Sequence, residues 1–248
     1  LARLAVKGIA TGVLSSSRLG RDDLTALAAP FAFVRPGMLA ITRAVSELVF
    51  RAHHIAGGEK DPGAALLRAA HGVMAWLNRA SLQVPKTAGT VLREFRCVAT
   101  LSRSSTAIQT LSIWAAGEKS VFVTLSHPPG EGAATARALA EAGARVTLIP
   151  DAMIYHAIER VDAAVVGADS ILADGSFVNK TGSHLMAAAC RELGKPLYVV
   201  AESCKLASAG ISKMLVLEEM DPAEVTQKEE AGIEVKNIYF ETTPAELV

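Results

Sequence analysis

Residues 161–182 read VDAAVVGADSILADGSFVNKTG and contain the strongest structural signals in the chain. The apolar run Ala163–Val166 is typical of a strand that is buried on both faces of a parallel sheet. The run stops at Gly167-Ala168-Asp169. Because ligands of open α/β sheets bind beyond the carboxyl ends of the strands, this pattern predicts that Asp169 stands at a functional site.

The second half of the stretch predicts a hairpin followed by a helix. Asp174-Gly175 separates two short apolar pieces, which indicates a tight turn, and a helical pattern then runs from Ser183 to Leu193. A basic turn at a helix N-terminus offers free N–H groups and a positive dipole end to an anion. The residues of this predicted phosphate-type cradle are Asn179, Lys180, Thr181, Gly182 and Ser183.

Short apolar runs alternate with helical patterns from residue 97 onward. This alternation predicts right-handed βαβ crossovers and a parallel sheet. The other predicted strands are Cys97–Leu101, Val121–Leu125, Val146–Ile149 and Leu197–Ala201, and Met214–Leu217 is a candidate for a last strand. The predicted helices between them are Ser104–Ala116, Glu131–Ala142 and Ala152–Arg160.

The first 89 residues have helical spacing and little β-branched alternation. Arg43–Arg51 reads as an amphipathic helix, and Ala64–Ala80 reads as another that starts after Asp61-Pro62. Gly57-Gly58 separates the two. The predicted fold is therefore α/β, with a smaller helical domain over residues 1–89 and a Rossmann-like parallel-sheet domain over residues 90–248.

Composition excludes several classes of protein. Lys and Arg number 25 against 25 Asp and Glu, which gives no electrostatic case for nucleic-acid binding. The three cysteines have no CxxC spacing, which argues against a disulfide framework or a zinc site and fits a reducing cytoplasm. No apolar run reaches the roughly 18 residues of a membrane span. We expect a cytoplasmic protein without a metal or redox cofactor.

Polar residues follow each of the predicted strands. Since carboxyl ends of parallel strands share one edge of a sheet, these side chains should converge there. They are Ser102, Ser126-His127, Asp151, Asp169 and Glu202. Arg103-Ser104-Ser105-Thr106 begins the next predicted helix, where the hydroxyls are expected either to cap the helix or to bind phosphate.

The ordered motifs GAD, DG and NKTG resemble a signature, GAD…NG…NKxGT, of the initiation factor 2B α/β/δ subunits. Two isomerases, which act on methylthioribose 1-phosphate and on ribose 1,5-bisphosphate, share this signature. The resemblance covers about residues 90–248. Its other matches are Thr100-Leu101-Ser102, Ser126–Gly132, Gly194-Lys195-Pro196, Ala201–Lys205 and Asn237–Pro244, which is similar to NPxFDxTP.

The resemblance implies roles for individual residues. Asp169 matches the acid/base aspartate of the isomerases, whereas Ser102 stands where their second catalytic group is a cysteine. A thiol titrates near pH 8.5, but a serine hydroxyl needs an assisting base. His127 likewise replaces an arginine. The resemblance further implies ligand or phosphate contacts from Arg35 (in an Arg-Pro turn), His127, Glu131, Gly132 and Lys205. The start of the predicted helix adds Arg103 and Ser104 as candidate phosphate contacts.

The leading interpretation is an initiation factor 2B-like protein that binds a phosphorylated sugar or nucleotide. The differences at Ser102 and His127 favour this binding function over catalysis. The alternative is an aldose–ketose isomerase of a 1-phosphorylated ribose, in which Asp169 moves the proton on a substrate oxygen. A third is a divergent isomerase of another deoxy- or thio-sugar. The resemblance also implies a homodimer.

Overall fold

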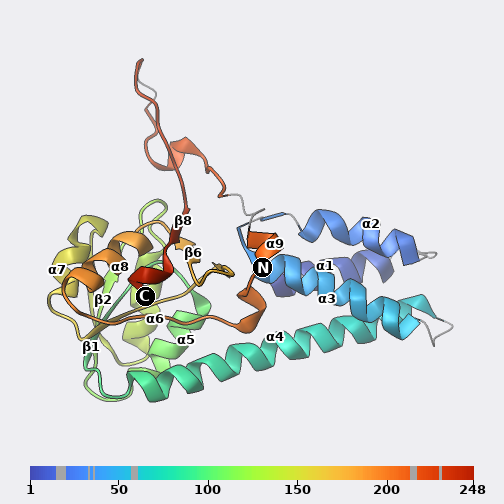
Figure 1. Ribbon diagram of the computed structural model, residues 1–248, viewed down its shortest axis with the longest axis horizontal. Helices are drawn as coiled ribbons and strands as arrows, with labels where there is room; N and C mark the ends of the chain where they lie inside the picture. Colours follow the sequence, from blue (N-terminus) through green and yellow to red (C-terminus); the bar gives the residue numbers. More distant parts are fainter. Residues whose placement is uncertain (15–20, 33, 36, 57–60, 213–216, 229–230) are drawn as a thin grey trace.

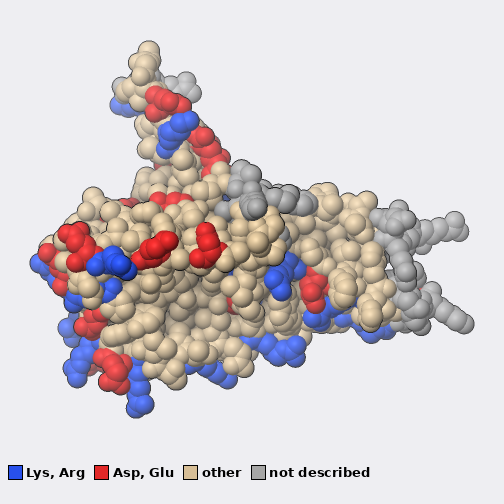
Figure 2. All heavy atoms as spheres, viewed as in Figure 1, with Lys and Arg blue, Asp and Glu red and all other residues tan. Residues whose placement is uncertain are grey.

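The structure is a computed structural model that describes the 248-residue chain except residues 15–20, 33, 36, 57–60, 213–216 and 229–230. An α/β part and a bundle of helices lie side by side, and the long helix α4 (Pro62–Leu92) runs beneath both (Figure 1). On the face seen in Figure 2, acidic and basic side chains are intermixed, and no continuous basic surface is visible.

The main sheet has five parallel strands in the order β3-β2-β1-β4-β7. Their bounds are β1 (Cys97–Thr100), β2 (Ser120–Thr124), β3 (Arg145–Ile149), β4 (Ala163–Val166) and β7 (Leu197–Val199). The connecting helices are α5 (Ser105–Trp114), α6 (Gly132–Glu141), α7 (Ile154–Ile158, preceded by the 3-10 turn η1, Asp151–Met153) and α8 (Ser183–Glu192). The predicted parallel α/β fold is confirmed.

Both faces of the central strands are covered, as the apolar run predicts. All of β4 is buried. Ala163 and Val165 pack with Leu111 of α5 and Leu139 of α6 in one core. Ala164 and Val166 alternate to the opposite face, where a second core contains Ile154, Ile158 and Met186 of α7 and α8. A helix layer on each side leaves the edge of the sheet at the strand ends as the place for a site.

A second, antiparallel sheet follows β4. Its order is β5-β6-β8, with bounds β5 (Ser170–Ile171), β6 (Phe177–Lys180) and β8 (Phe240–Thr243). The hairpin predicted at Asp174-Gly175 is confirmed by the pairing of β5 with β6. Asn179 and Lys180 lie inside β6, paired with Glu241 and Phe240, and not in a turn as predicted.

The N-terminal helices are α1 (Ala2–Leu14), α2 (Arg21–Ala32), α3 (Leu39–Ala56) and α4. Asp61 caps α4 by accepting the N–H groups of Gly63 and Ala64, which confirms its predicted start. The helix continues past residue 89 to Leu92, which packs in the core beside Trp114. One helix therefore joins the bundle to the sheet, and the predicted boundary falls inside it.

The remaining elements lie near the C-terminus. They are η2 (Ser203–Lys205), α9 (Ala209–Ser212), η3 (Pro222–Glu224) and η4 (Ala245–Leu247). The segment that contains η3 projects from the body before β8 returns (Figure 1). The predicted strand Met214–Leu217 and the Gly57-Gly58 separator fall largely or wholly outside the described residues. No described helix is long and apolar enough to cross a membrane.

Candidate functional site

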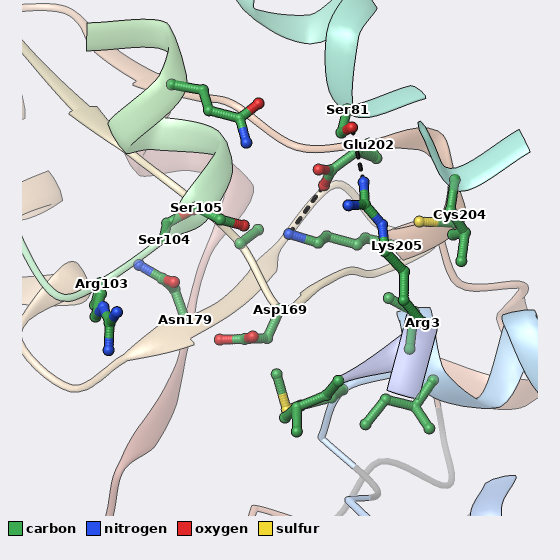
Figure 3. Close-up of a pocket in the computed structure, with 18 of the residues that line it drawn as sticks. Arg3, Ser81, Arg103, Ser104, Ser105, Asp169, Asn179, Glu202, Cys204 and Lys205 are labelled. Atoms are coloured by element: carbon green, nitrogen blue, oxygen red, sulfur yellow. Dashed lines mark hydrogen bonds and ion pairs between the residues drawn. The ribbon is translucent and has the colours of Figure 1, made fainter. Parts of the chain in front are cut away.

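A cavity of about 360 Å³ lies between the carboxyl edge of the sheet and the helical bundle. Ser102 after β1, Asp169 after β4 and Glu202 after β7 all line it, which confirms that these strand ends converge. Figure 3 shows Asp169 between Arg103 and Asn179 on one side and Arg3 and Lys205 on the other. The other lining residues include Ser81, Ser104, Ser105, Gln109 and Cys204.

Asp169 is the acidic group best suited to proton transfer. Its backbone N–H donates to the Val178 carbonyl at 2.8 Å, which fixes the turn after β4. Burial raises the pKa of its carboxyl to about 6, against the opposing charges of Lys205 and Arg35. No described side chain hydrogen-bonds to this carboxyl. A group that titrates near neutrality inside a cavity can both give and take a proton.

Gly167 allows this turn to form beside α5. A methyl group at Gly167 would lie 2.2 Å from Ser104 Oγ and 2.5 Å from Ser104 Cβ, far inside contact distance. Ser104 is the N-cap of α5, and its Oγ accepts the N–H of Ala107 at 3.3 Å. The predicted capping role of Ser104 is confirmed, and the glycine of the GAD motif is required by close packing.

Arg103 is the exposed cation at the mouth of the cavity. It makes no hydrogen bond or ion pair with any described residue, whereas its neighbour Ser104 is committed to the helix cap. Arg3 enters the same cavity from α1, where its Nη2 donates to Ser81 Oγ at 2.9 Å. Nothing in the sequence around Arg3 signals this position, because the contact joins helices that are far apart along the chain.

Glu202 and Lys205 neutralise one another in the cavity wall. Lys205 Nζ lies 3.0 Å from Glu202 Oε2, and Thr106 Oγ1 donates to Glu202 Oε1 at 2.6 Å. Burial would raise the pKa of Glu202, but Lys205 and the hydrogen bond from Thr106 hold it below its ordinary value. Glu202 is therefore a fixed carboxylate, and Asp169 is the group that titrates.

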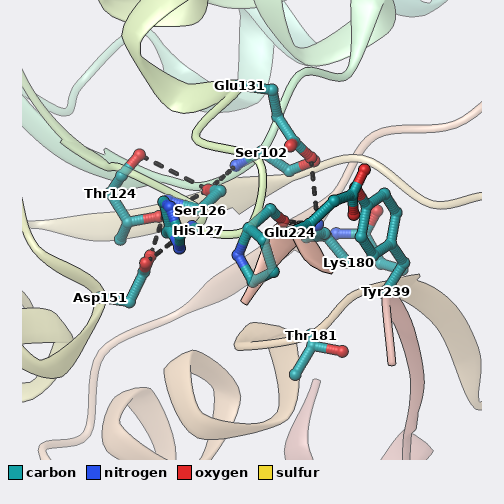
Figure 4. A network of polar contacts seen from close by, with 12 residues as sticks. Ser102, Thr124, Ser126, His127, Glu131, Asp151, Lys180, Thr181, Glu224 and Tyr239 are labelled. Atoms are coloured by element: carbon teal, nitrogen blue, oxygen red, sulfur yellow. Dashed lines mark hydrogen bonds and ion pairs between the residues drawn. The ribbon is translucent and has the colours of Figure 1, made fainter. Parts of the chain in front are cut away.

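Ser102 is held by three hydrogen bonds in a left-handed backbone conformation, with φ of 62°. Its N–H donates to Ser126 Oγ at 2.7 Å, and its carbonyl accepts from Thr135 Oγ1 at 2.7 Å. Its own hydroxyl donates to Glu131 Oε1 at 3.0 Å (Figure 4). Such a conformation is uncommon without glycine and persists where the surroundings impose it.

Lys180 is the buried partner of Glu131, not the phosphate-binding turn residue that the sequence predicts. Its side chain is 4% exposed, and Nζ lies 3.6 Å from Glu131 Oε1. Nζ also donates to the Pro128 carbonyl and lies 3.6 Å from the centre of the Tyr239 ring. Burial lowers the pKa of Lys180, with Glu131 opposing this effect. Lys180 is not among the residues that line the cavity.

The N-terminus of α8 is occupied by a carboxylate from the chain itself. Glu241 Oε1 accepts the N–H groups of Gly182 at 2.7 Å and His184 at 2.8 Å. The prediction of free N–H groups at this turn is therefore wrong. Pairing of β6 with β8 brings Glu241 here, and the sequence alone does not reveal that pairing.

The other members of the predicted cradle have internal partners. Thr181 Oγ1 donates to the Ile238 carbonyl at 2.6 Å, and Ser183 Oγ donates to the Lys180 carbonyl at 2.6 Å. Asn179 also has an internal partner, since its Nδ2 donates to Ser183 Oγ at 2.9 Å, but unlike the others it lines the cavity.

His127 and Arg35 lie outside the cavity lining. The N–H groups of Ser126 and His127 donate to the two carboxylate oxygens of Asp151 at 2.7 and 2.9 Å, which makes Asp151 the brace of this turn. Arg35 Nε lies 2.8 Å from Glu218 Oε2, and Pro36 beside it lies outside the described residues.

The predicted site residues thus form two groups. Those that line the cavity are Asp169, Ser102, Arg103, Ser104, Asn179 and Lys205. Those that lie behind or beside it are Lys180, Thr181, Gly182, Ser183, His127, Glu131, Gly132 and Arg35. Close packing requires glycine at position 132, since a methyl group there would lie 1.8 Å from the Thr124 carbonyl oxygen. Within the described residues, no three His, Cys, Asp or Glu side chains are grouped to hold a metal ion.

The proteins that this chain resembles include both isomerases and initiation factors. The chain is 32% identical over 189 residues to a ribose 1,5-bisphosphate isomerase of Archaeoglobus fulgidus, covering 74% of this chain and 60% of that protein. The translation initiation factor eIF-2B of Pyrococcus horikoshii OT3 superimposes with a TM-score of 0.82 at 25% identity, covering 100% of this chain and 86% of that one.

The 5-methylthioribose 1-phosphate isomerase of the same organism has a TM-score of 0.79 at 21% identity, over 100% of this chain and 76% of that one, and shows the shared fold. A family match covers almost the whole sequence, residues 7–248. The chain belongs to the Initiation factor 2 subunit family.

Proposed function

We propose that the cavity binds a 1-phosphorylated ribose and that Asp169 moves a proton in its aldose–ketose isomerisation. The observation that carries this proposal is the carboxyl of Asp169, which titrates at about 6 and faces the cavity without a hydrogen-bond partner among the described residues. A binding pocket alone has no need of such a group. The similarity to ribose 1,5-bisphosphate isomerases supports the same choice, so we place isomerisation ahead of the binding function favoured by the sequence.

The cavity supplies groups for a phosphorylated sugar. Arg103 is an exposed guanidinium with no described partner, and its planar fork suits two oxygens of one phosphate. Asn179 and the Glu202–Lys205 pair offer a donor amide and a polar wall for sugar hydroxyls. In our proposal the anchor for phosphate is Arg103 and not the turn before α8, whose N–H groups bind Glu241.

The reaction requires protons to move at oxygen and at carbon. The protonated carboxyl of Asp169 gives its proton to the ring oxygen as the C1–O bond breaks, and it recovers a proton from the C2 hydroxyl as the ketone forms. At carbon, one proton leaves C2 and one is added at C1. C2 is thereby oxidised and C1 reduced, so the substrate itself supplies both electrons and no external oxidant is needed.

The second candidate is a binding function without catalysis. The observation in its favour is Ser102, which offers a hydroxyl where the isomerases it resembles use a thiol. Serine without an assisting base is a poor acid or base near neutral pH. In this case the phosphorylated ligand would bind at the same cavity and remain unchanged.

Calorimetry combined with NMR separates these candidates. We expect ribose 1,5-bisphosphate to bind the wild type, and Arg103→Met to weaken binding at least about tenfold, as for loss of a charged hydrogen bond. Arg145→Met, an exposed arginine on β3, is the matched control. Conversion of the bound sugar supports isomerisation, whereas binding without conversion supports the second candidate. Absence of binding to 1-phosphorylated sugars would contradict both.

The chain spans 60% of the length of the Archaeoglobus isomerase, so the activity of the whole protein is part of this proposal. Homodimer formation stays a prediction from the resemblance, and a cytoplasmic location stays a prediction from the cysteine pattern.

A further inference from the structure

We infer that Ser102 and Glu131 act as one unit in the proton transfer at carbon, with the Ser102 hydroxyl contacting the substrate and Glu131 acting through it. This inference rests on the proposed isomerisation and assigns its missing second group. Ser102 lines the same cavity as Asp169, and Glu131 lies behind it.

The hydrogen bonds of Ser102 fix the direction of its hydroxyl. Because Ser102 Oγ donates its proton to Glu131 Oε1 at 3.0 Å, its lone pairs are left to accept a proton from elsewhere. The backbone N–H of Ser102 donates to Ser126 Oγ, and its carbonyl accepts from Thr135 Oγ1. These two bonds hold the backbone at φ of 62°. Three independent anchors on one serine exceed what a simple turn needs, and strained backbone held this firmly is typical of functional positions.

Glu131 is itself held in place for this role. Gly132, which follows it, packs against the Thr124 carbonyl so closely that no side chain fits, and this places Glu131 at the start of α6. Lys180 Nζ lies 3.6 Å from the same Oε1 atom that accepts the Ser102 proton. The ammonium group is buried and pinned between Pro128 and the Tyr239 ring, so it orients the carboxylate without entering the cavity.

The proton transfer balances without any further reactant. The C2–H bond breaks, its proton passes to Ser102 Oγ, and the hydroxyl proton of Ser102 passes to Glu131. The electron pair of the C2–H bond forms the C1–C2 double bond. In the second half the sequence reverses, so that Glu131 returns its proton to Ser102 and Ser102 delivers one to C1, while Asp169 handles the protons on oxygen.

Variants of both residues test this unit by steady-state kinetics with ribose 1,5-bisphosphate. We expect Glu131→Gln to lower kcat by about 10²-fold or more, the usual contribution of a general base, with KM changed less than about threefold. Glutamine keeps an oxygen that can accept the hydrogen bond from Ser102 but cannot take its proton. Glu141→Gln, an exposed glutamate at the end of the same helix, is the matched control.

Rescue by a thiol distinguishes proton transfer from a structural role. A cysteine at this position can ionise by itself, so Ser102→Cys in the Glu131→Gln background should recover at least about tenfold in kcat. Ser102→Ala, which removes only the hydroxyl, should lose as much as Glu131→Gln, and the double variant should lose no more. This second variant keeps the test open if Glu131→Gln folds poorly.

Two outcomes would overturn the inference while the proposed function stands. In the first, the wild type converts ribose 1,5-bisphosphate and the kcat of Glu131→Gln or Ser102→Ala stays within about threefold of the wild-type value. The other is a thiol at position 102 that fails to rescue Glu131→Gln. A wild type without turnover would overturn the proposed isomerisation and this inference together, and is recognised before any variant is made.

Discussion

Replacing Asp169 by asparagine should change the pH dependence of stability by an amount set by its pKa. Burial raises this pKa from 3.8 to about 6, so the folded protein holds the proton more tightly than the unfolded chain does. Between pH 4 and 6 the unfolded state therefore binds fewer protons than the native state, and the wild type loses stability as pH rises. Below pH 4 the carboxyl is protonated in both states, and it costs nothing.

The size of the effect follows from the same values. At 1.36 kcal/mol per pH unit, the difference between 3.8 and about 6 corresponds to about 3 kcal/mol lost between pH 3 and pH 8. Asparagine does not titrate, so the difference in free energy of unfolding between variant and wild type isolates this one group. For a chain of 248 residues, 3 kcal/mol corresponds to a shift of about 6–12 °C in Tm.

Urea unfolding of both proteins from pH 4 to pH 8 measures this difference directly. We expect Asp169→Asn to gain stability relative to the wild type steadily as pH rises through 6. Asp174→Asn, at the exposed turn between β5 and β6, is the control for a general effect of removing a carboxyl. Its pKa is lowered from 3.8 by the hydrogen bond from Ser176, so its difference from the wild type should stay nearly flat between pH 4 and pH 8. A wild-type-minus-variant difference that is flat across this range would refute a raised pKa at Asp169.

Two further predictions concern the packing around the site. Glu241→Ala should lower the free energy of unfolding by about 1–3 kcal/mol, because two N–H groups of the α8 N-terminus lose their acceptor. The control Glu246→Ala should change it by no more than about 0.5 kcal/mol. Equal urea midpoints for the two variants would contradict the capping role of Glu241. Gly167→Ala should lower the free energy of unfolding by about 1–3 kcal/mol and weaken sugar-phosphate binding, since the new methyl group displaces Ser104 at the cavity. Urea unfolding and calorimetry should detect the two effects. Wild-type values in both measurements would contradict the close contact.

The sheet and half of its site were predictable because they depend on local patterns. Apolar runs such as Ala163–Val166 identify strands covered on both faces, and parallel strands bring the residues after them to one edge. Ser102, Asp169 and Glu202 could therefore be placed together without a structure. The strand end at Gly167-Ala168-Asp169 is visible in the sequence, while the packing of Gly167 against Ser104 depends on the contact between two separate segments.

The remainder depends on contacts between distant segments. Lys180 and Asn179 alternate on β6, so Lys180 is buried against Glu131 while Asn179 reaches the cavity. Which of the two faces the cavity depends on how β6 packs against distant segments. Arg3 reaches the site through helix packing that no motif encodes. The predicted helix Ala64–Ala80 is shorter than α4, which continues through Pro85 and Gly89 to Leu92. The core contacts of Val84, Ala88 and Leu92 support this continuation.

Conversion of ribose 1,5-bisphosphate, followed by proton NMR with wild type and Asp169→Asn side by side, tests the central claim most directly. We expect the wild type to form the ketose slowly, because serine replaces the thiol, and faster at pH 6 than at pH 8, because Asp169 must start protonated. We expect Asp169→Asn still to bind the bisphosphate but to leave its C1 and C2 signals unchanged. Unchanged signals with the wild type, or conversion at the wild-type rate by Asp169→Asn, would contradict this claim.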